Sequence, residues 1–168
     1  MAKTFGCCRV VYNHFLRLRT DAYHEGKKIG YHESSALLTE LKQTEGYIWL
    51  NEVSSVPLQQ SLRHLQTAFV NFFEKRAAYP QFKKKHSKQS AEYTKSAFKY
   101  DPKTKTLEVS KLGKLKIRWS REFTSTPTTI TITKRPSGRY FVTLCLDEPV
   151  HELPKTGASV GVDLGISR

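Results

Sequence analysis

The sequence of 168 residues lacks the features that mark several common classes of protein. No apolar run approaches the roughly 18–20 residues that span a bilayer, and the first residues show no secretory pattern. Only three cysteines are present, two of them adjacent at Cys7 and Cys8, and they form neither a disulfide framework nor a C-x-x-C zinc site. We therefore expect a cytoplasmic protein with no membrane partner.

Signatures of several enzyme classes are also missing. No serine lies in a Gly-x-Ser-x-Gly setting, and no glycine-rich loop is present that could cradle a phosphate. The six histidines are scattered along the chain without the spacing of metal ligands. We expect no small-molecule substrate.

Acidic residues are scarce in residues 75–121. The excess of basic residues in this segment accounts for nearly all of the formal charge of the chain, which is +13. Residues 1–74 carry 8 basic and 7 acidic side chains, and residues 122–168 carry 5 of each. Residues 75–121 carry 15 basic and 3 acidic side chains. A block this basic is typical of proteins that bind DNA or RNA. A solvated basic face that aids solubility is the alternative.

The first 78 residues predict a bundle of helices. Apolar residues recur at three- and four-residue steps over residues 3–26, as on one face of a helix. A second, shorter helix is expected after His32, with Ser34 or Ser35 near its cap. A third follows Pro57, and its apolar seam consists of Leu58, Leu62, Leu65, Phe69 and Phe72. We interpret this seam as core rather than as a ligand site.

Residues 79–92 have few apolar anchors, which predicts a loop or an extended basic arm. The arm carries four lysines, at Lys83, Lys84, Lys85 and Lys88. Ammonium groups neutralise phosphates, and neighbouring aromatic rings can stack on bases. The rings concerned are Tyr79, Phe82 and Tyr93, and a place in the core is an equally good interpretation for them.

From residue 93 the apolar period shortens towards two, which predicts a domain of short strands. We expect strands at 93–100, 106–109, 114–119, 128–134 and 139–146, with turns at 101–103 and 135–138. Strands of this length and spacing favour a small barrel. A joint containing proline leads to a last apolar strand at 159–163. The predicted fold class is α+β.

The last strand ends in the sharpest local motif, Val160-Gly161-Val162-Asp163-Leu164-Gly165. Such a strand presents one carboxylate at the carboxyl edge of a sheet. Nucleases of the RNase H/RuvC kind use this carboxylate to bind divalent metals, and actin-like ATPases bring a similar turn to a nucleotide phosphate. An ordinary turn is the third interpretation, and the motif alone does not separate them.

Seven stretches together resemble the TnpB (OrfB) family of transposon-encoded RNA-guided DNA endonucleases. They occur in the order of the family and cover nearly the entire chain. They are residues 6–15 (GCCRVVYNHF), 49–53 (WLNEV), 57–62 (PLQQSL), 68–73 (AFVNFF), 79–85 (YPQFKKK), 112–118 (LGKLKIR) and 161–165 (GVDLG).

The resemblance implies an architecture and a set of partners. Residues 3–78 would form a helical recognition bundle of helix-turn-helix type, residues 93–150 a wedge-like and incomplete β-barrel, and residues 158–168 the start of a RuvC (RNase H-like) nuclease domain. The partners would be guide RNA and target DNA. Asp163 would be the first metal-binding and catalytic carboxylate, with Mg²⁺ as the implied ion. The nucleic-acid-binding residues would be Tyr31, Ser35, Gln59, Arg76, Lys83, Lys84, Lys85 and Lys88.

Two departures from the family limit what this chain is expected to do. The basic strand that usually precedes the Phe5-Gly6-Cys7 region is missing, which would leave an edge of the barrel unpaired. The later catalytic carboxylates and the zinc ribbon of the family are also missing. Two-metal cleavage needs several carboxylates, so we expect binding without cleavage. The alternatives are an endonuclease completed by another polypeptide and a generic basic RNA-binding protein.

Overall fold

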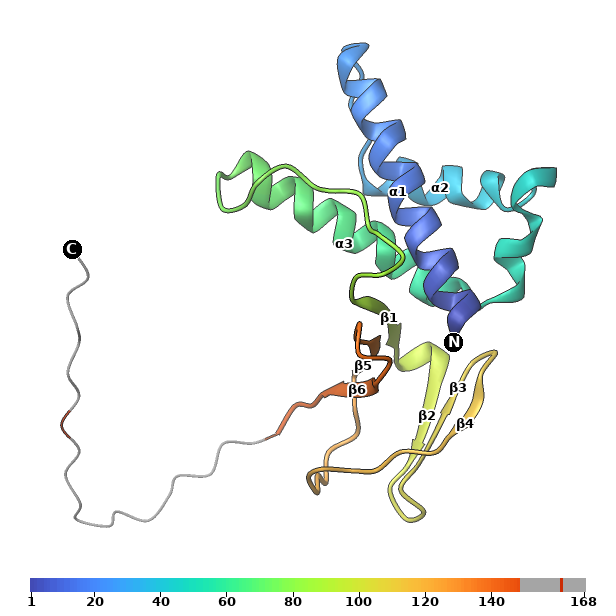
Figure 1. Ribbon diagram of the computed structural model, residues 1–168, viewed down its shortest axis with the longest axis vertical. Helices are drawn as coiled ribbons and strands as arrows, with labels where there is room; N and C mark the ends of the chain where they lie inside the picture. The colour runs from blue at the N-terminus through green and yellow to red at the C-terminus, as the bar shows by residue number, and fades with distance from the viewer. Residues whose placement is uncertain (149–160, 162–168) are drawn as a thin grey trace.

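The computed structural model describes residues 1–148 and residue 161 (Figure 1). Helices come first, as α1 (Ala2–His24), α2 (Tyr31–Leu41) and α3 (Ser55–Phe73), with a 3₁₀-helix η1 (Glu45–Glu52) before α3. The strands follow, as β1 (Gln89–Thr94), β2 (Phe98–Asp101), β3 (Thr106–Val109), β4 (Gly113–Leu115), β5 (Thr129–Lys134) and β6 (Tyr140–Cys145), with a 3₁₀-turn η2 (Lys95–Ala97) after β1. The predicted α+β class, helices before strands, is confirmed.

The long helices α1 and α3 pack against each other and against β1. The apolar stripe of α1 is buried at Val11 and Phe15, and the seam of α3 is buried at Leu58, Leu62 and Leu65. The prediction that this seam is core is therefore confirmed for these positions, whereas Phe72 at its end is only half-buried.

The helix α2 begins at Tyr31 rather than after His32, with Gly30 as its N-cap. The Gly30 amide donates a hydrogen bond to Glu33 Oε2 at 2.8 Å, and Ser34 Oγ donates to the Gly30 carbonyl at 2.7 Å. Ser34 therefore lies inside the first turn, and neither serine is the cap. The 3₁₀-helix η1 was not predicted, because its eight residues are too few to show a clear apolar period.

The strands form two antiparallel sheets with the orders β1-β5-β6 and β2-β3-β4. No closed barrel is formed by residues 1–148, where a small and incomplete barrel was expected. The expected strand at 93–100 is interrupted by η2, so that β1 joins one sheet and β2 joins the other. β1 also begins at Gln89, inside the segment expected to be an arm.

The other strand predictions are confirmed in large part. β3 has the expected bounds, and the turn at 135–138 closes the β5–β6 hairpin through a hydrogen bond of 2.9 Å from the Arg135 amide to the Arg139 carbonyl. Gly138 has φ +81°, a conformation that favours glycine. β4 ends at Leu115 instead of residue 119: residues 116–119 have no regular secondary structure, and Trp119 packs edge-on against Tyr100 with ring centroids 5.9 Å apart.

Helices and sheets share one hydrophobic core. Tyr93 of β1 and Ile130 of β5 are fully buried in the same cluster as Leu38 of α2 and Leu62 of α3. This shared core fixes the helices relative to the sheets and places the intervening segment 76–88 on the surface of α1. No helix in the described ranges is long and apolar enough to cross a bilayer.

Candidate nucleic-acid interface

The expected arm, residues 79–92, is shortened by β1, which begins at Gln89. In the structure the basic arm is the segment 76–88, which has no regular secondary structure and is held against one face of α1 by side chains. Asn13 Nδ2 donates a hydrogen bond to the Lys83 carbonyl at 3.0 Å, and Asn13 Oδ1 accepts one from the Lys83 amide at 2.8 Å. Thr20 Oγ1 lies 2.6 Å from Tyr79 Oη. Positions 13 and 20 are seven residues apart and therefore face the same way on a helix. The arm is thus docked at two points along α1.

A third contact fixes the end of the arm where β1 begins. Arg9 Nη1 donates to Gln89 Oε1 at 2.9 Å. The amide nitrogen of Gln89 donates in turn to the carbonyls of Lys84 and Ser87, at 2.8 and 2.9 Å. Gln89 therefore connects α1 to the lysine-rich part of the arm and gives that part a defined backbone path.

The predicted phosphate-binding residues of this segment have different surroundings. The side chains of Lys84, Lys85 and Lys88 are exposed, as phosphate contact requires. Lys83 is half-buried, and its Nζ lies 4.2 Å from the centroid of the Tyr12 ring, so burial lowers the pKa of Lys83. Arg76 is exposed and forms an ion pair with Glu74.

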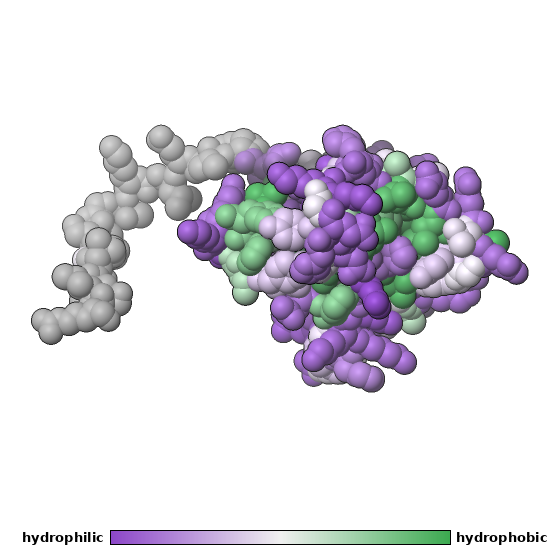
Figure 2. All heavy atoms as spheres, turned by 90° about the horizontal axis from the view of Figure 1, so that it is seen from above, coloured by the Kyte–Doolittle hydropathy of each residue, from purple (hydrophilic) through white to green (hydrophobic). Residues whose placement is uncertain are grey.

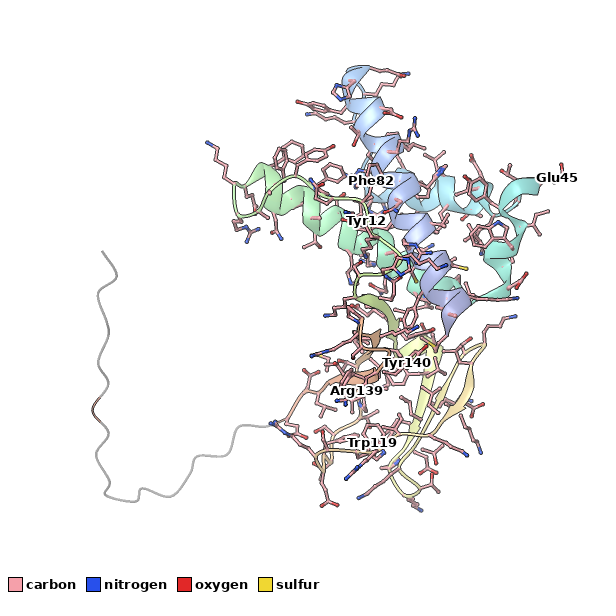
Figure 3. All side chains as sticks on the ribbon, in the orientation of Figure 1. Tyr12, Glu45, Phe82, Trp119, Arg139 and Tyr140 are labelled. Carbon is pink, nitrogen blue, oxygen red and sulfur yellow. The ribbon has the colours of Figure 1, made fainter. Side chains whose placement is uncertain are left out.

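The three aromatic residues of the arm region have separate places. Tyr93 is fully buried and belongs to the core. Tyr79 packs edge-on against Phe72, with ring centroids 5.1 Å apart. Phe82 is 56% exposed and lies over α1 (Figure 3). Of the three rings, Phe82 is therefore the one best placed to stack on a base.

The predicted residues of the helical bundle meet at one point between α2 and α3. Gln59 Oε1 accepts a hydrogen bond from Tyr31 Oη at 3.2 Å and another from Ser35 Oγ at 3.1 Å. Both lone pairs of that oxygen are then used, whereas the amide nitrogen of Gln59 keeps its donor capacity. We name Tyr31, Ser35 and Gln59 the α2–α3 triad.

Arg63 completes the surroundings of the triad and was not predicted from the sequence. It follows Gln59 by one helical turn, and its guanidinium carbon lies 4.6 Å from the centroid of the Tyr31 ring. The spacing of four residues on α3 was a usable signal, because such residues share a face. Asn13 gave no such signal, since an uncharged polar residue on a helix has no pattern that reveals a partner 70 residues away.

A groove runs between α1 and the α2–η1 region. Its lining includes Arg9, Arg17, His14, Tyr47 and Phe82. The His14 ring lies edge-on to Tyr47 at 5.5 Å, and burial lowers the pKa of His14. The groove thus combines guanidinium groups and aromatic rings with the carboxylates of Asp21 and Glu25, and Arg17 forms an ion pair with Asp21 at 3.7 Å.

The rest of the basic block lies on the second sheet and the loops around it. Lys99 and Lys114 flank Glu108 in the register of β2, β3 and β4. All three side chains are exposed, so acidic and basic groups alternate across this sheet. Hydrophilic residues cover most of the face seen in Figure 2. The arm, in contrast, has no acidic residue between positions 75 and 91.

The carboxylate predicted to bind metal, Asp163, lies outside the described residues, as do the expected strand at 159–163 and the segment 158–168 apart from residue 161. Among residues 1–148 and residue 161, no group of three His, Cys, Asp or Glu side chains could hold a metal ion.

Comparison with known proteins gives a match to a family model and matches to individual proteins. A family model for a helix-turn-helix domain of the OrfB–IS605 type matches residues 1–28, which contain α1. A Streptomyces pristinaespiralis protein named "Putative RNA-guided DNA endonuclease" is 49% identical over 99% of this chain, and the alignment covers 42% of that protein. InsQ of Escherichia coli K12, which has the same descriptive name, is 32% identical over the whole chain and is also covered to 42%.

The third match is shorter. The "Virulence protein VsdF" of Salmonella dublin is 34% identical over half of this chain, and 79% of that protein is covered. The chain therefore spans about two fifths of the length of the first two relatives.

Proposed function

Because this chain belongs to the TnpB (OrfB) family, we propose that residues 1–148 bind nucleic acid, with target DNA and a guide RNA as the partners. The observation that carries the proposal is the meeting of Tyr31, Ser35 and Gln59 at one point of the bundle, beside a clamped and strongly basic arm. The names of the two longer relatives, which describe RNA-guided DNA endonucleases, support the choice of partners.

The arm supplies the part of the binding that does not depend on sequence. Lys84, Lys85 and Lys88 are exposed on a backbone that Asn13 and Gln89 hold in place. Ammonium groups on a fixed backbone lose less conformational freedom when they contact phosphates than those on a free segment. Each phosphate that they neutralise releases counterions and adds to the salt dependence of binding.

The α2–α3 triad supplies the reading of bases. Tyr31 and Ser35 occupy the acceptor oxygen of Gln59, so the amide of Gln59 meets a base edge as a hydrogen-bond donor. Purine N7, guanine O6 and thymine O4 are the acceptors that the major groove offers to such a donor. We propose that Gln59 contacts one of these atoms in a short motif beside the target.

The test is a binding assay with a randomised DNA duplex library and the variants Gln59→Ala and Gln60→Ala. Gln60 is the matched control, because it is the same residue type on the same helix and is also half-buried. Loss of a good base contact costs about 1–3 kcal/mol of discrimination at one base pair. We expect Gln59→Ala to lose the preference at that base pair and Gln60→Ala to keep it. Equal sequence preference in both variants would show that the α2–α3 triad does not recognise the base pair.

Cleavage of DNA is a second candidate, favoured by the Gly-Val-Asp163-Leu-Gly motif. One carboxylate does not fix two metal ions, so we propose cleavage only where a further segment supplies the other acidic residues. The test adds Mg²⁺ and the remaining segment of a relative to this chain, with Asp163→Ala as the control. Cleavage by the unaltered mixture alone would support this candidate, and no cleavage with both pieces folded would reject it.

A further inference from the structure

The outer edge of β6 is the strongest surface feature that nucleic-acid binding does not explain. β6 pairs with β5 on one side, and the part of the chain that the structure describes provides no strand on its other side. The Arg139 carbonyl accepts a hydrogen bond from Arg135 of the β5–β6 turn, so position 139 directs its polar groups towards β5. Successive residues of a strand direct their backbone N–H and C=O groups to opposite sides. Tyr140, Val142 and Leu144 therefore direct these groups away from β5.

The side chains of β6 do not protect this edge. Its sequence, Tyr-Phe-Val-Thr-Leu-Cys, consists of good strand formers, and Tyr140 and Phe141 are 51% and 43% exposed. Natural edge strands are usually blocked by lysine, proline or a bulge, and β6 has none of these. Arg139 lies at one end of the strand (Figure 3), and Asp147 and Glu148 follow its other end.

We propose that β6 is a docking edge for a second copy of this chain, with the two β6 strands antiparallel about a twofold axis at Thr143. The residues whose backbone N–H and C=O groups point outwards are even-numbered, so an even-numbered residue of one copy must pair with an even-numbered residue of the other. The twofold axis then passes through one residue of β6 and its own copy, rather than between two residues. Val142, Thr143 and Leu144 are the residues near the middle of the strand through which it can pass.

Charge selects among these three registers. The register centred on Thr143 places Arg139 of each copy opposite Asp147 of the other, one ion pair at each end of the ladder. The same register places Val142 opposite Leu144 and therefore joins apolar residues to each other. An axis at Val142 would place Arg139 opposite Cys145 instead, and an axis at Leu144 would place Asp147 opposite Phe141.

The chemistry of this edge favours protein over nucleic acid. Residues 140–146 carry no charged side chain and lie outside the basic block of residues 75–121. Two nearby cations, Lys134 and Arg135, belong to β5 and its turn and lie over the Tyr140 and Phe141 rings, whereas the outward backbone donors and acceptors of β6 suit a second β-strand. The paired area is small, since each copy contributes one short strand, so the association is weak and depends on concentration.

The test is disulfide trapping at the proposed axis in nuclease-treated protein. Thr143→Cys in a Cys145→Ser background would place two thiols on facing, non-hydrogen-bonded positions with Cα atoms about 4.5 Å apart, within reach of a disulfide. Phe141→Cys in the same background is the control, because its own copy would lie roughly 13 Å away along the strand. Cys7 and Cys8 are buried and do not compete.

We expect the Thr143→Cys protein to form a covalent dimer under mild oxidation, at least tenfold more than the Phe141→Cys protein. Equal trapping in the two variants would overturn the register. A protein that stays monomeric in sedimentation at several hundred micromolar, with no trapping, would overturn the proposal. Trapping that appears only when DNA or RNA is added would also overturn it, because the nucleic acid would then bring the copies together.

A charge exchange tests the ion pairs at the ends of the ladder separately. Arg139→Asp should lower the yield of the Thr143→Cys disulfide several-fold by placing like charges opposite each other. The further change Asp147→Arg should restore the yield, since it recreates an opposite-charge pair. A double variant that traps no better than Arg139→Asp alone would refute the pairing of Arg139 with Asp147.

Discussion

Replacement of Asn13 by alanine is the perturbation that most directly tests how the basic arm is held. The Asn13 amide group makes two hydrogen bonds with the backbone of Lys83, at 3.0 and 2.8 Å. An intramolecular hydrogen bond contributes about 0.5–1.5 kcal/mol net, so the two together stabilise the docked arm by about 1–3 kcal/mol. A change of this size alters the ratio of docked to open arm by a factor of roughly 5 to 140.

The assay is limited proteolysis with trypsin, in which the cut after Lys84 or Lys85 is followed by mass spectrometry. Cleavage requires the arm to leave α1, and its rate follows the open population when opening and closing are fast. We expect Asn13→Ala to be cut roughly 5 to 140 times faster at this site. The cleavage rate of Asn13→Asp should lie between those of the unaltered protein and Asn13→Ala. A carboxylate still accepts a hydrogen bond from the Lys83 amide but cannot donate one to the Lys83 carbonyl.

Asn51→Ala is the matched control for this experiment. The Asn51 amide nitrogen also donates two hydrogen bonds, to the carbonyls of Lys42 and Ile48 at 2.9 and 3.1 Å, but it lies on η1 and contacts no residue of the arm through them. Its cleavage rate at the arm should equal that of the unaltered protein. An Asn13→Ala protein cut no faster than the Asn51→Ala protein would refute the clamp.

Three further predictions concern single residues of the core and the arm. Lys83→Met should leave DNA affinity nearly unchanged, whereas Lys84→Met should weaken it, because Lys83 packs on Tyr12 and Lys84 is exposed; equal losses in a binding titration would contradict this. Tyr93→Phe should raise the free energy of unfolding by about 1 kcal/mol, since Tyr93 Oη is buried without a hydrogen-bond partner among the described residues. A lower midpoint in urea would count against that prediction. The folded-state pKa of His14 lies below its ordinary value of 6.5, so the unfolded chain binds more protons and stability is lost as pH falls below 6.5. The free energy of unfolding of His14→Asn should therefore fall less between pH 7.5 and 5.5 than that of the unaltered protein. Identical decreases would show that His14 does not contribute to the pH dependence of stability.

The helices could be predicted from the sequence because their signals are local. The seam of Leu58, Leu62 and Leu65 on α3 repeats at three and four residues, and the three side chains are buried as expected. The division into helices and then strands follows from the change in apolar period near residue 93. The shared core, in contrast, depends on how Tyr93 and Ile130 pack beneath the helices, and periodicity contains no information about that contact.

The break between β1 and β2 could not be predicted, because residues 93–100 are all compatible with one extended strand. The short turn η2 divides them, and the division follows from pairing partners far away, since Tyr93 faces Ile130 and Phe98 faces Val109. The arrangement of the predicted small, incomplete barrel as two separate sheets could not be predicted for the same reason. Strand pairing is a property of the whole sheet rather than of one segment.

The candidate interface was predicted in part. The resemblance to the family assigned Tyr31, Ser35 and Gln59 to nucleic-acid binding, which stays a prediction, and the structure brings the three side chains within hydrogen-bond distance. Charge alone could not distinguish Lys83 from Lys84. The two lysines differ in the direction that the docked backbone gives their side chains, which leaves Lys84 exposed and Lys83 half-buried. That difference depends on Asn13, and because Asn13 and Lys83 are 70 positions apart, the sequence does not reveal the hydrogen bonds between them.

The most direct test of nucleic-acid binding through the arm is the salt dependence of affinity for a short DNA duplex. The observed binding constant should fall linearly with salt on logarithmic axes, with a slope that reflects the number of phosphates neutralised. The triple variant Lys84→Gln, Lys85→Gln and Lys88→Gln should make that slope shallower by roughly 2–3, at about 0.9 for each phosphate that is no longer neutralised. A slope near zero for the unaltered protein, or an unchanged slope in the triple variant, would contradict the account.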